Sequence, residues 1–374
     1  MTPHPAPADT RPDGRPDARP DARPDADARA RALLVAARTR TDAVIAPLLD
    51  RVPRGSARVL GYQWGLWDAE GRPAGEDGAG RGKALRAALV FAAAGAAGRS
   101  PDEPLVAAGA AAVELLHTLS LLHDDVMDGD ELRRGRPAAW RVFGAGAVER
   151  AVRELTPHAV TLLVETPAED PTAPARAAGV LGHALVRLAQ GQALDLALEE
   201  EARPEAAATL RVHADKTGSL FACACELGAG PGAAAADLAA FGEHLGLAFQ
   251  IVDDLLGVWG DPAVTGKPAG ADLTARKKSH PVAAALAPAD EPGPTGDRAR
   301  RLLALYGRPG PWTAPEAAEV RRLLDASGAR ALSRDAARTH ERAAAAALTR
   351  LRPPHPDAAE DLRTLATFCL SRAH

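Results

Sequence analysis

The sequence predicts an all-α fold, a single large helical bundle behind a disordered N-terminal arm. The chain has 374 residues, of which 46% are hydrophobic and only 3% aromatic, so its core must consist of alanine, leucine and valine. Alanine and leucine are strong helix formers, whereas the β-branched and aromatic residues that favour strands are sparse. No segment alternates apolar and polar residues between turn signals, as the strands of a hairpin do. These observations favour helices over sheets throughout.

Residues 1–30 are predicted to be a disordered, low-complexity arm, and residues 31–374 the folded domain. The unit Arg-Pro-Asp-Gly/Ala occurs four times within residues 11–26. Proline at every fourth residue blocks a helix, and no apolar residue larger than alanine is present to be buried. Such an arm is most simply a solvated linker. The alternative is a tether that loads the protein into a larger assembly.

Helical spacing of apolar residues predicts the elements that follow. A first helix over 31–49 is interrupted at Pro53-Arg54-Gly55, and a glycine-rich connection covers 61–82. A long helix over 105–127 has prolines before it and Gly129 after it. The remaining predicted elements are a loop at 166–174, helices at 175–201, 204–228 and 233–258, a Pro/Gly-rich stretch with a short helix at 289–314, and helices at about 315–350 and 357–372.

Charge and cysteine content exclude several classes of function. The formal net charge is −4, with both signs mixed along the chain, so nothing indicates nucleic acid or an anionic membrane surface as a partner. Cys223, Cys225 and Cys369 have neither zinc-ligand nor disulfide spacing and fit a reducing compartment as buried apolar residues. The N-terminus lacks a signal-peptide core, and the longest apolar run, 87–98, is too short to cross a bilayer. We expect a soluble cytoplasmic protein without a transmembrane segment.

The predicted helix over 105–127 ends in the most informative motif, His123-Asp124-Asp125-Val126-Met127-Asp128. At 100° per residue, Asp124 and Asp128 lie on one narrow stripe, and Asp125 lies beside it. Carboxylates one turn apart repel each other, and those at the C-terminal end of a helix also oppose its dipole. Such a helix end loses stability without local compensation.

A second acidic pair, Asp253-Asp254, ends another apolar helix, one turn after Gln250. If the two helix ends face each other, carboxylates ~5 Å apart repel by roughly 3 kcal/mol per pair at an effective dielectric near 20. Several such pairs would rival a typical total stability of ~5–15 kcal/mol. Carboxylate oxygens suit Mg²⁺, which also binds substrate phosphates. Alone, either cluster could equally be a solvated, charged helix end.

Basic residues near these clusters indicate what the metal would accompany. Singly, each is more simply a surface charge, but arginine and lysine are also the usual phosphate ligands. As a set beside two acidic clusters, they describe a site for two diphosphates. The set comprises Lys83, Arg86, Arg133, Arg134, Lys216, Lys267, Lys277 and Lys278.

From about residue 61 to the C-terminus, the chain resembles the trans-isoprenyl (polyprenyl) diphosphate synthase family. The resemblance rests on motifs that occur in the family's order: Gly82-Lys83-x-x-Arg86; Glu114, His117, Ser120 and His123-Asp124-Asp125-x-x-Asp128; Arg133-Arg134-Gly135; Gly191-Gln192-x-x-Asp195; Lys216-Thr217; Phe249-Gln250-x-x-Asp253-Asp254; Gly266-Lys267; and Asp272 to Lys277. It implies the isoprenoid (terpenoid) synthase fold, a homodimer, and a prenyltransferase that condenses isopentenyl diphosphate with an allylic diphosphate into a longer linear product.

The resemblance also implies a role for each matching residue. Metal-binding carboxylates would hold three Mg²⁺ ions against the allylic diphosphate: Asp124, Asp128 and Asp253, supported by Asp125 and Asp254. Cations that bind the same diphosphate would be Arg133, Lys216, Lys267 and Lys277. Residues that bind isopentenyl diphosphate would be Lys83, Arg86, His117 and Arg134. Thr217 and Gln250 would lie near the developing carbocation.

The implied chemistry is ionisation of the allylic C–O bond, attack by the double bond of isopentenyl diphosphate, and loss of a proton to the released diphosphate. An apolar pocket would keep water from the cation. Leu119 and Ser120 lie about one turn before Asp124 and carry no aromatic ring that would stop a growing chain. By analogy with the family, they predict a product of geranylgeranyl length or somewhat longer.

Several positions depart from the family's pattern. Ala87 stands where the family has proline, Arg81 where it has glycine, Trp140 where it has histidine, and Gly257 where it has a third aspartate. A Gly-Asp pair is also missing at 151–154. These changes bear on turnover more than on fold. The principal carboxylates and cations are present, so we expect an active enzyme.

Two other readings fit parts of the sequence. A class I terpene cyclase shares the first acidic motif, but it needs no second-substrate cations such as Lys83 and Arg86, and no Asn/Asp-x-x-Ser-x-x-x-Glu triad is evident. A non-catalytic or weakly active cargo subunit could keep the fold and dock its arm into an assembly; the arm resembles those of isoprenoid enzymes packaged in encapsulin shells, which would place it in a nanocompartment. A P-loop ATPase is excluded by the spacing over 260–267.

Overall fold

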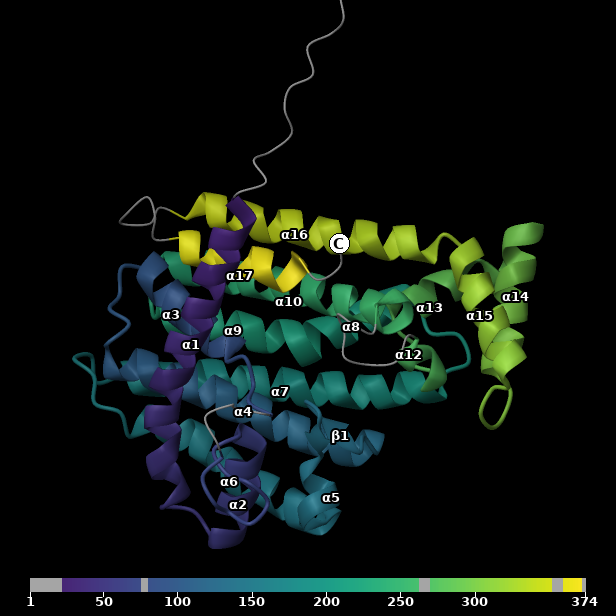
Figure 1. The fold of residues 1–374 in the computed structure, drawn as a ribbon. Helices are drawn as coiled ribbons and strands as arrows, with labels where there is room; N and C mark the ends of the chain where they lie inside the picture. Colours follow the sequence, from purple (N-terminus) through teal and green to yellow (C-terminus); the bar gives the residue numbers. More distant parts are fainter. Residues whose placement is uncertain (1–21, 75–79, 262–269, 352–358, 372–374) are drawn as a thin grey trace, which may run out of the picture.

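The computed structural model describes residues 22–74, 80–261, 270–351 and 359–371, and these are almost entirely helical (Figure 1). The only strands in the described part of the chain, β1 (Leu132–Arg133) and β2 (Arg136–Pro137), form one short antiparallel hairpin. This confirms the predicted all-α fold class.

Helices make up most of the described part of the chain. In chain order they are α1 (Ala22–Leu49), α2 (Arg54–Trp64), α3 (Leu85–Ala96), α4 (Pro104–Asp128), α5 (Ala139–Phe143), α6 (Ala145–Val164), α7 (Ala173–Glu200), α8 (Ala206–His213), the π-helix η1 (Ala214–Gly218), α9 (Ser219–Ala229), α10 (Ala234–Trp259), α12 (Ala271–Thr274), α13 (His280–Leu286), the 3₁₀-helix η2 (Ala287–Asp290), α14 (Pro294–Tyr306), α15 (Ala314–Ala326), α16 (Ala329–Arg350) and α17 (Glu360–Leu370).

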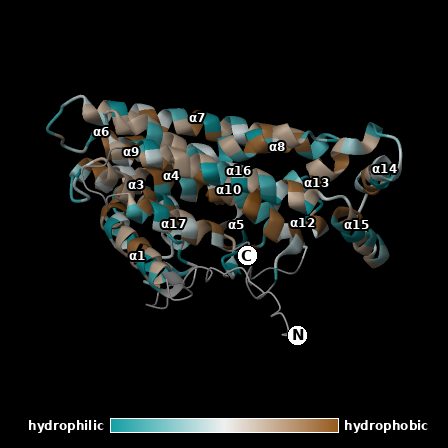
Figure 2. Ribbon diagram, turned by 90° about the horizontal axis from the view of Figure 1, so that it is seen from above, coloured by the Kyte–Doolittle hydropathy of each residue, from teal (hydrophilic) through white to brown (hydrophobic). Residues whose placement is uncertain are grey.

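Helices α4, α7, α9, α10 and α16 run side by side, with α1 at one end of the bundle and α14 and α15 at the other (Figures 1 and 2). Helix α4 packs against α3, α6 and α9, and its Leu115, Leu119 and Leu122 are fully buried. By length and composition α4 could cross a membrane, but 72% of its most apolar window is buried inside the protein. It is the central core helix.

Small residues let these helices approach closely. A Cβ atom at Gly242 of α10 would lie 2.4 Å from the Phe221 carbonyl oxygen of α9, so no side chain fits there without moving backbone. The three cysteines are free and buried, as predicted, and burial raises the pKa of the Cys369 thiol to about 12.

Two N-terminal boundaries differ from the sequence-based expectation. Helix α1 begins at Ala22, so residues 22–30 of the predicted arm are helical; residues 1–21 lie outside the described part. Proline in a first helical turn loses no hydrogen bond, and Asp25 favours that helix end. Helix α2 runs to Trp64, so Tyr62 and Trp64 are helical and the loop begins only at Gly65.

Two predicted helices are interrupted. The helix expected over 204–228 contains the π-helix η1 between α8 and α9. The helix expected over 315–350 is two helices, α15 and α16, separated at Ser327 and Gly328; Gly328 has a left-handed φ of 77°. The helices predicted over 105–127, 175–201, 233–258 and 357–372 agree with α4, α7, α10 and α17 to within about three residues.

Candidate active site

The C-terminal end of α4 places Asp124 in an acidic surrounding. The Asp124 side chain is half-buried, and burial raises its pKa. Asp128, one turn further along α4, and Asp195 of α7 add repulsion that raises it further, while Lys216 and Arg133 oppose the shift. Asp128 itself is exposed. Burial and the neighbouring carboxylates together outweigh the attraction of these two cations.

Helix α7 adds two carboxylates to this group. Asp195 accepts a 2.7 Å hydrogen bond from Lys216 Nζ. Burial raises the pKa of Glu199, and the charges of Asp195 and Asp128 raise it further. No role was assigned to Glu199 from sequence, although it stands four residues after Asp195, on the same face of a helix. That spacing was the available signal.

Asp125 points away from this group. Its side chain is 1% exposed, and one carboxylate oxygen accepts hydrogen bonds from Arg133, including one of 2.8 Å from Nε. Burial alone would lower the pKa of Arg133, but the hydrogen bond to Asp125 and the charges of Asp125, Asp130 and Asp124 together raise it. Asp125 thus fixes the Arg133 side chain beside α4.

The hairpin directs Arg133 and Arg134 to different places. Arg134 and Gly135 form its turn with φ values of 53° and 75°, the left-handed pair typical of a two-residue hairpin. Arg133 is the last residue of β1 and reaches Asp125, whereas Arg134, in the turn, reaches the Gly80 carbonyl and lies against Gly82.

The two aspartates at the end of α10 also differ. Asp253 is exposed, whereas Asp254 is buried and accepts hydrogen bonds from His213 Nε2 (3.1 Å) and the His280 backbone N–H (2.9 Å). Burial alone would raise the pKa of Asp254, but these partners and the Gln250 side chain lower it. Asp254 therefore ties α10 to α8 and α13.

The π-helix η1 contacts both acidic regions. Lys216 binds Asp195 and lies near Asp124, and Thr217 Oγ1 donates to Gln250 Oε1 of α10 at 2.9 Å. Helix α7 approaches η1 so closely that a Cβ atom at Gly191 would lie 2.8 Å from the backbone nitrogen of Lys216. A turn of π-helix contains about one residue more than a turn of α-helix. This extra residue in η1 places Lys216 and Thr217 between α4 and α10.

Another carboxylate stands where the second motif lacks its third aspartate. A Cβ atom at Gly257 would lie 1.9 Å from Asp272 Oδ2 of α12. The Asp272 side chain thus lies where the side chain of a residue at position 257 would begin.

Lys277 lies near several carboxylates. Burial would lower the pKa of Lys277, but Asp272, Asp128, Asp130 and Asp195 raise it. Lys277 therefore lies between the ends of α4, α7 and α10, whereas Lys267 lies outside the described residues.

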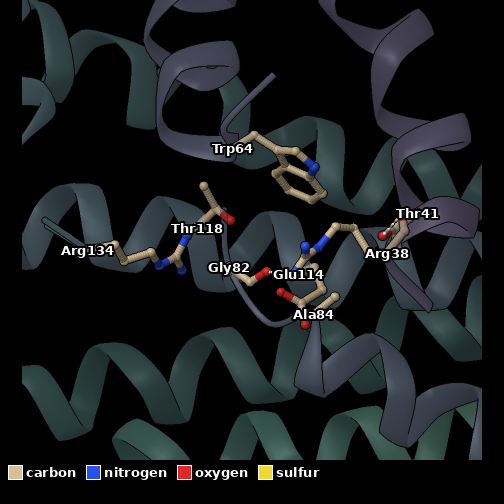
Figure 3. Close-up of a pocket in the computed structure, with 8 residues that line it drawn as sticks. All are labelled: Arg38, Thr41, Trp64, Gly82, Ala84, Glu114, Thr118 and Arg134. Carbon is tan, nitrogen blue, oxygen red and sulfur yellow. Dashed lines mark hydrogen bonds between the residues drawn. The ribbon is translucent and has the colours of Figure 1, made fainter. Parts of the chain in front are cut away.

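A second cleft opens beside this region, about 340 Å³ in volume including the solvent at its mouth. Figure 3 shows Arg38 and Arg134 reaching toward Gly82 and Glu114 from opposite sides. Glu114 Oε1 accepts the Ala87 N–H at 3.0 Å. Sequence reasoning missed Arg38, because α1 carries no motif that marks it.

Arg86 and His117 lie beside this cleft. Burial lowers the pKa of Arg86 to about 10, and its buried Nε has no hydrogen-bond partner. Burial, followed by the charges of Arg86 and Arg134, lowers the pKa of His117 well below its ordinary value. Lys83 is exposed on the loop between Gly82 and Ala84. The cleft is rich in positive charge and contains one neutralising carboxylate, Glu114.

Leu119 and Ser120 lie on different faces of α4. Leu119 is 1% exposed in the core, and half-buried Ser120 donates to the His117 carbonyl at 2.9 Å. Asp261 follows the second acidic pair in the sequence but lies beyond α10, which ends at Trp259, so it is not on the same helix as Asp253 and Asp254.

The described residues do not form a metal cage of their own. Among them, no three His, Cys, Asp or Glu side chains are grouped closely enough to hold a metal ion. Mg²⁺ commonly binds through one or two carboxylates and completes its coordination with water and substrate phosphates. Separate carboxylates on α4, α7 and α10, with lysine and arginine side chains beside them, fit an ion of that kind.

Comparison with known proteins gives a consistent picture. Residues 76–308 match the polyprenyl synthetase family. A geranylgeranyl diphosphate synthase of Mycobacterium tuberculosis is 39% identical over 322 residues, covering 85% of this chain and 88% of that protein. A (2E,6E)-farnesyl diphosphate synthase of Mycobacterium bovis is 37% identical over 332 residues, covering 87% and 88%.

The fold agrees with a solved structure as well. The crystal structure of a polyprenyl synthetase from Streptomyces coelicolor A3(2) superposes with a TM-score of 0.81 at 37% identity, covering 91% of this chain and 99% of that one.

Proposed function

The chain belongs to the polyprenyl synthetase family and is a prenyltransferase that elongates isoprenyl diphosphates, and from this premise we propose how its residues divide the work. The observation that carries the proposal is the position of η1. Lys216 faces the carboxylates of α4 and α7, while Thr217 binds Gln250 beside the acidic end of α10. One short segment thus connects both acidic motifs.

The allylic diphosphate is assigned to the acidic region. Asp124, Asp128 and Asp253 are the metal ligands of this proposal, with three Mg²⁺ ions as predicted from the family. Mg²⁺ bound there would supply Lewis-acid stabilisation of the negative charge on the departing diphosphate. Asp125 and Asp254 take positioning roles instead, because their carboxylates are buried on Arg133 and His213. Asp272 is assigned the place left by Gly257.

The cations of this region bind and orient the same diphosphate. Arg133, Lys216 and Lys277 come from the hairpin, η1 and the segment after α12, so they can surround the group from several directions. Lys267 is assigned to it from the family resemblance alone. Preorganised cations stabilise charge as the C–O bond ionises.

Thr217 and Gln250 are assigned to the carbocation. The Thr217 hydroxyl donates its proton to Gln250, so its lone pairs remain available to a positive charge. Apolar residues of α4 and α10 exclude water from the cation. Isopentenyl diphosphate attacks it with its double bond, and the proton lost passes to the released diphosphate.

Isopentenyl diphosphate is assigned to the second cleft, with Lys83, Arg86, His117 and Arg134 as its ligands. A neutral His117 can donate one hydrogen bond to phosphate without adding repulsion among the arginines. A second diphosphate site also distinguishes the proposed prenyltransferase from a class I terpene cyclase, which uses one diphosphate substrate. Incubation with geranylgeranyl diphosphate alone should yield no hydrocarbon or alcohol.

The test of the function is incubation with labelled isopentenyl diphosphate, an allylic diphosphate and Mg²⁺, with sizing of the products. We expect chain-elongated diphosphates from the wild type and a loss of about 100-fold or more in Asp124→Asn. Full activity in Asp124→Asn would contradict the assigned role.

The product proposed is of geranylgeranyl length or somewhat longer. Relatives of similar sequence identity are named geranylgeranyl and farnesyl diphosphate synthases. The proposed product length is therefore based on Leu119 and Ser120. Leu119→Phe should shorten the product. Unchanged length would show that this part of α4 does not set it.

The quaternary structure and the N-terminal arm belong to the same proposal. We assign a cytoplasmic homodimer, and the arm as a linker with no part in catalysis. Removal of residues 1–21, which precede α1, should leave activity intact. Loss of activity would contradict the assignment of the arm as a linker with no part in catalysis.

A further inference from the structure

Helix α1 contributes side chains to the second cleft, although it lies outside the residues that match the family. The family match begins at residue 76, whereas Arg38 and Thr41 of α1 line the cleft together with Gly82, Glu114 and Arg134 (Figure 3). The Arg38 guanidinium donates to the Gly82 carbonyl. A guanidinium has five N–H donors, so this one bond leaves most of them for other acceptors.

The cleft has more positive than negative charge. Arg38, Arg86 and Arg134 all interact electrostatically with one carboxylate, Glu114. Burial lowers the pKa of all three arginines, and repulsion between neighbouring arginines lowers each further. Arg38 and Arg86 are partly buried and Arg134 is exposed. A cleft lined by charges of one sign attracts an ion of the opposite sign, so this arrangement favours a bound anion with several acceptor oxygens.

Helix α1 is held against the cleft by a contact that involves one of the altered family positions. Arg81 binds Asp42 of α1 at 3.1 Å, and the Trp64 indole N–H donates to the same carboxylate at 2.7 Å. Asp42 is therefore occupied by Arg81 and Trp64. Arg38 lies one turn before Asp42 on α1 and interacts electrostatically with both Asp42 and Glu114, and it lines the cleft.

We propose that Arg38 is a further substrate-binding residue, which binds the diphosphate of isopentenyl diphosphate together with Arg86 and Arg134. This rests on the proposed function of the cleft. The diphosphate would lie between guanidinium groups from α1, α3 and the hairpin, and charge-assisted bonds from several directions fix both its position and its orientation.

The experiment measures binding of isopentenyl diphosphate alone by calorimetry, together with steady-state kinetics, for wild type, Arg38→Ala and Arg38→Gln. Glutamine keeps an N–H donor for the Gly82 carbonyl but has no charge. We expect both variants to weaken binding of isopentenyl diphosphate by about 10- to 100-fold, the range for a hydrogen bond to a charged group. The KM for the allylic substrate should stay within about twofold.

Arg40→Ala is the matched control. Arg40 lies on the same helix, but binds Asp102 and the Pro101 carbonyl away from the cleft. The Arg40→Ala substitution removes the same charge from the protein as Arg38→Ala and should leave binding of isopentenyl diphosphate unchanged. Circular dichroism and melting temperature of each variant establish that it is folded.

Three results would overturn the proposal. Wild-type binding in Arg38→Gln would mean that Arg38 only holds the Gly82 loop. Equal increases in the KM of both substrates would indicate a general structural effect. A loss as large in Arg40→Ala would indicate long-range charge alone. Failure of the proposed function is distinguishable, because the wild-type protein would then neither bind isopentenyl diphosphate nor elongate an allylic primer.

Discussion

The five aspartates of the two acidic motifs do not have equivalent environments. Asp124, Asp128 and Asp253 are exposed or half-buried, whereas Asp125 and Asp254 are buried with a cationic or histidine partner. Helical periodicity places Asp125 beside the stripe of Asp124 and Asp128, but it gives no partner. His213 precedes Asp254 by 41 residues along the chain, and such a contact depends on tertiary packing that no local pattern encodes.

This division predicts opposite effects of two neighbouring substitutions. Asp254→Asn removes charge from buried hydrogen bonds to His213 and His280 and should lower the free energy of unfolding by about 1.5–3 kcal/mol. Asp253→Asn, at an exposed position, should leave the free energy of unfolding within about 0.5 kcal/mol and lower kcat/KM instead. Urea unfolding and steady-state kinetics of both variants measure the difference. Loss of stability in Asp253→Asn alone would reverse the assignment.

At the scale of elements, the close contact of α7 with η1 controls where Lys216 and Thr217 lie. Gly191→Ala would place a methyl group 2.8 Å from both the backbone nitrogen of Lys216 and the Cβ atom of Asp215, so the backbone of α7 or η1 must move. We expect a loss of about 1–3 kcal/mol in stability, together with a reduced kcat.

Gly182→Ala is the control on the same helix, because nothing lies within 4 Å of the added methyl group. Alanine is the better helix former, so this variant should gain roughly 0.5–1 kcal/mol and keep its activity. If Gly191→Ala behaved like Gly182→Ala, the position of η1 would not depend on α7.

The junction of α13 with α10 and α16 predicts a dependence of stability on pH. His280 is buried, with Nδ1 2.9 Å from Ser333 Oγ; burial, then the charge of His213, lowers its pKa to about 4. Its unfolded pKa is about 6.5, so the unfolded state binds more protons between these values. The contribution of His280 to the free energy of unfolding is complete above pH 6.5 and is lost as pH falls toward 4. This contribution amounts to at most ~3 kcal/mol.

His280→Gln should therefore lose less stability than wild type between pH 7 and pH 4.5. Urea unfolding at the two pH values measures this, with His183→Gln on the exposed face of α7 as the control. An unchanged difference between the two pH values would show that His280 does not carry the effect.

At the scale of the whole molecule, composition and apolar periodicity were sufficient for the fold class and for most helices. The differences have local causes. The first turn of α1 tolerates Pro24, Gly328 ends one helix and begins the next, and η1 keeps the apolar spacing of an α-helix on either side of it. A pattern with a period of 3.6 residues does not reveal a single inserted residue.

The candidate site was predicted in its residue types more than in its arrangement. The motifs supplied the carboxylates and most cations of both regions. Arg38, Glu199 and the contact between Asp272 and Gly257 required the structure, because each joins segments far apart in the sequence. The same packing explains how the chain tolerates glycine at position 257.

The central claim is that the ends of α4 and α10 share one diphosphate. The most direct measurement is calorimetric binding of a non-ionising allylic diphosphate analogue, with and without Mg²⁺, to wild type, Asp124→Asn, Asp253→Asn and the double variant. We predict Mg²⁺-dependent binding that each single substitution weakens, with a double loss clearly smaller than the sum of the two. Losses that add fully, or binding that needs neither Mg²⁺ nor either aspartate, would contradict the shared site.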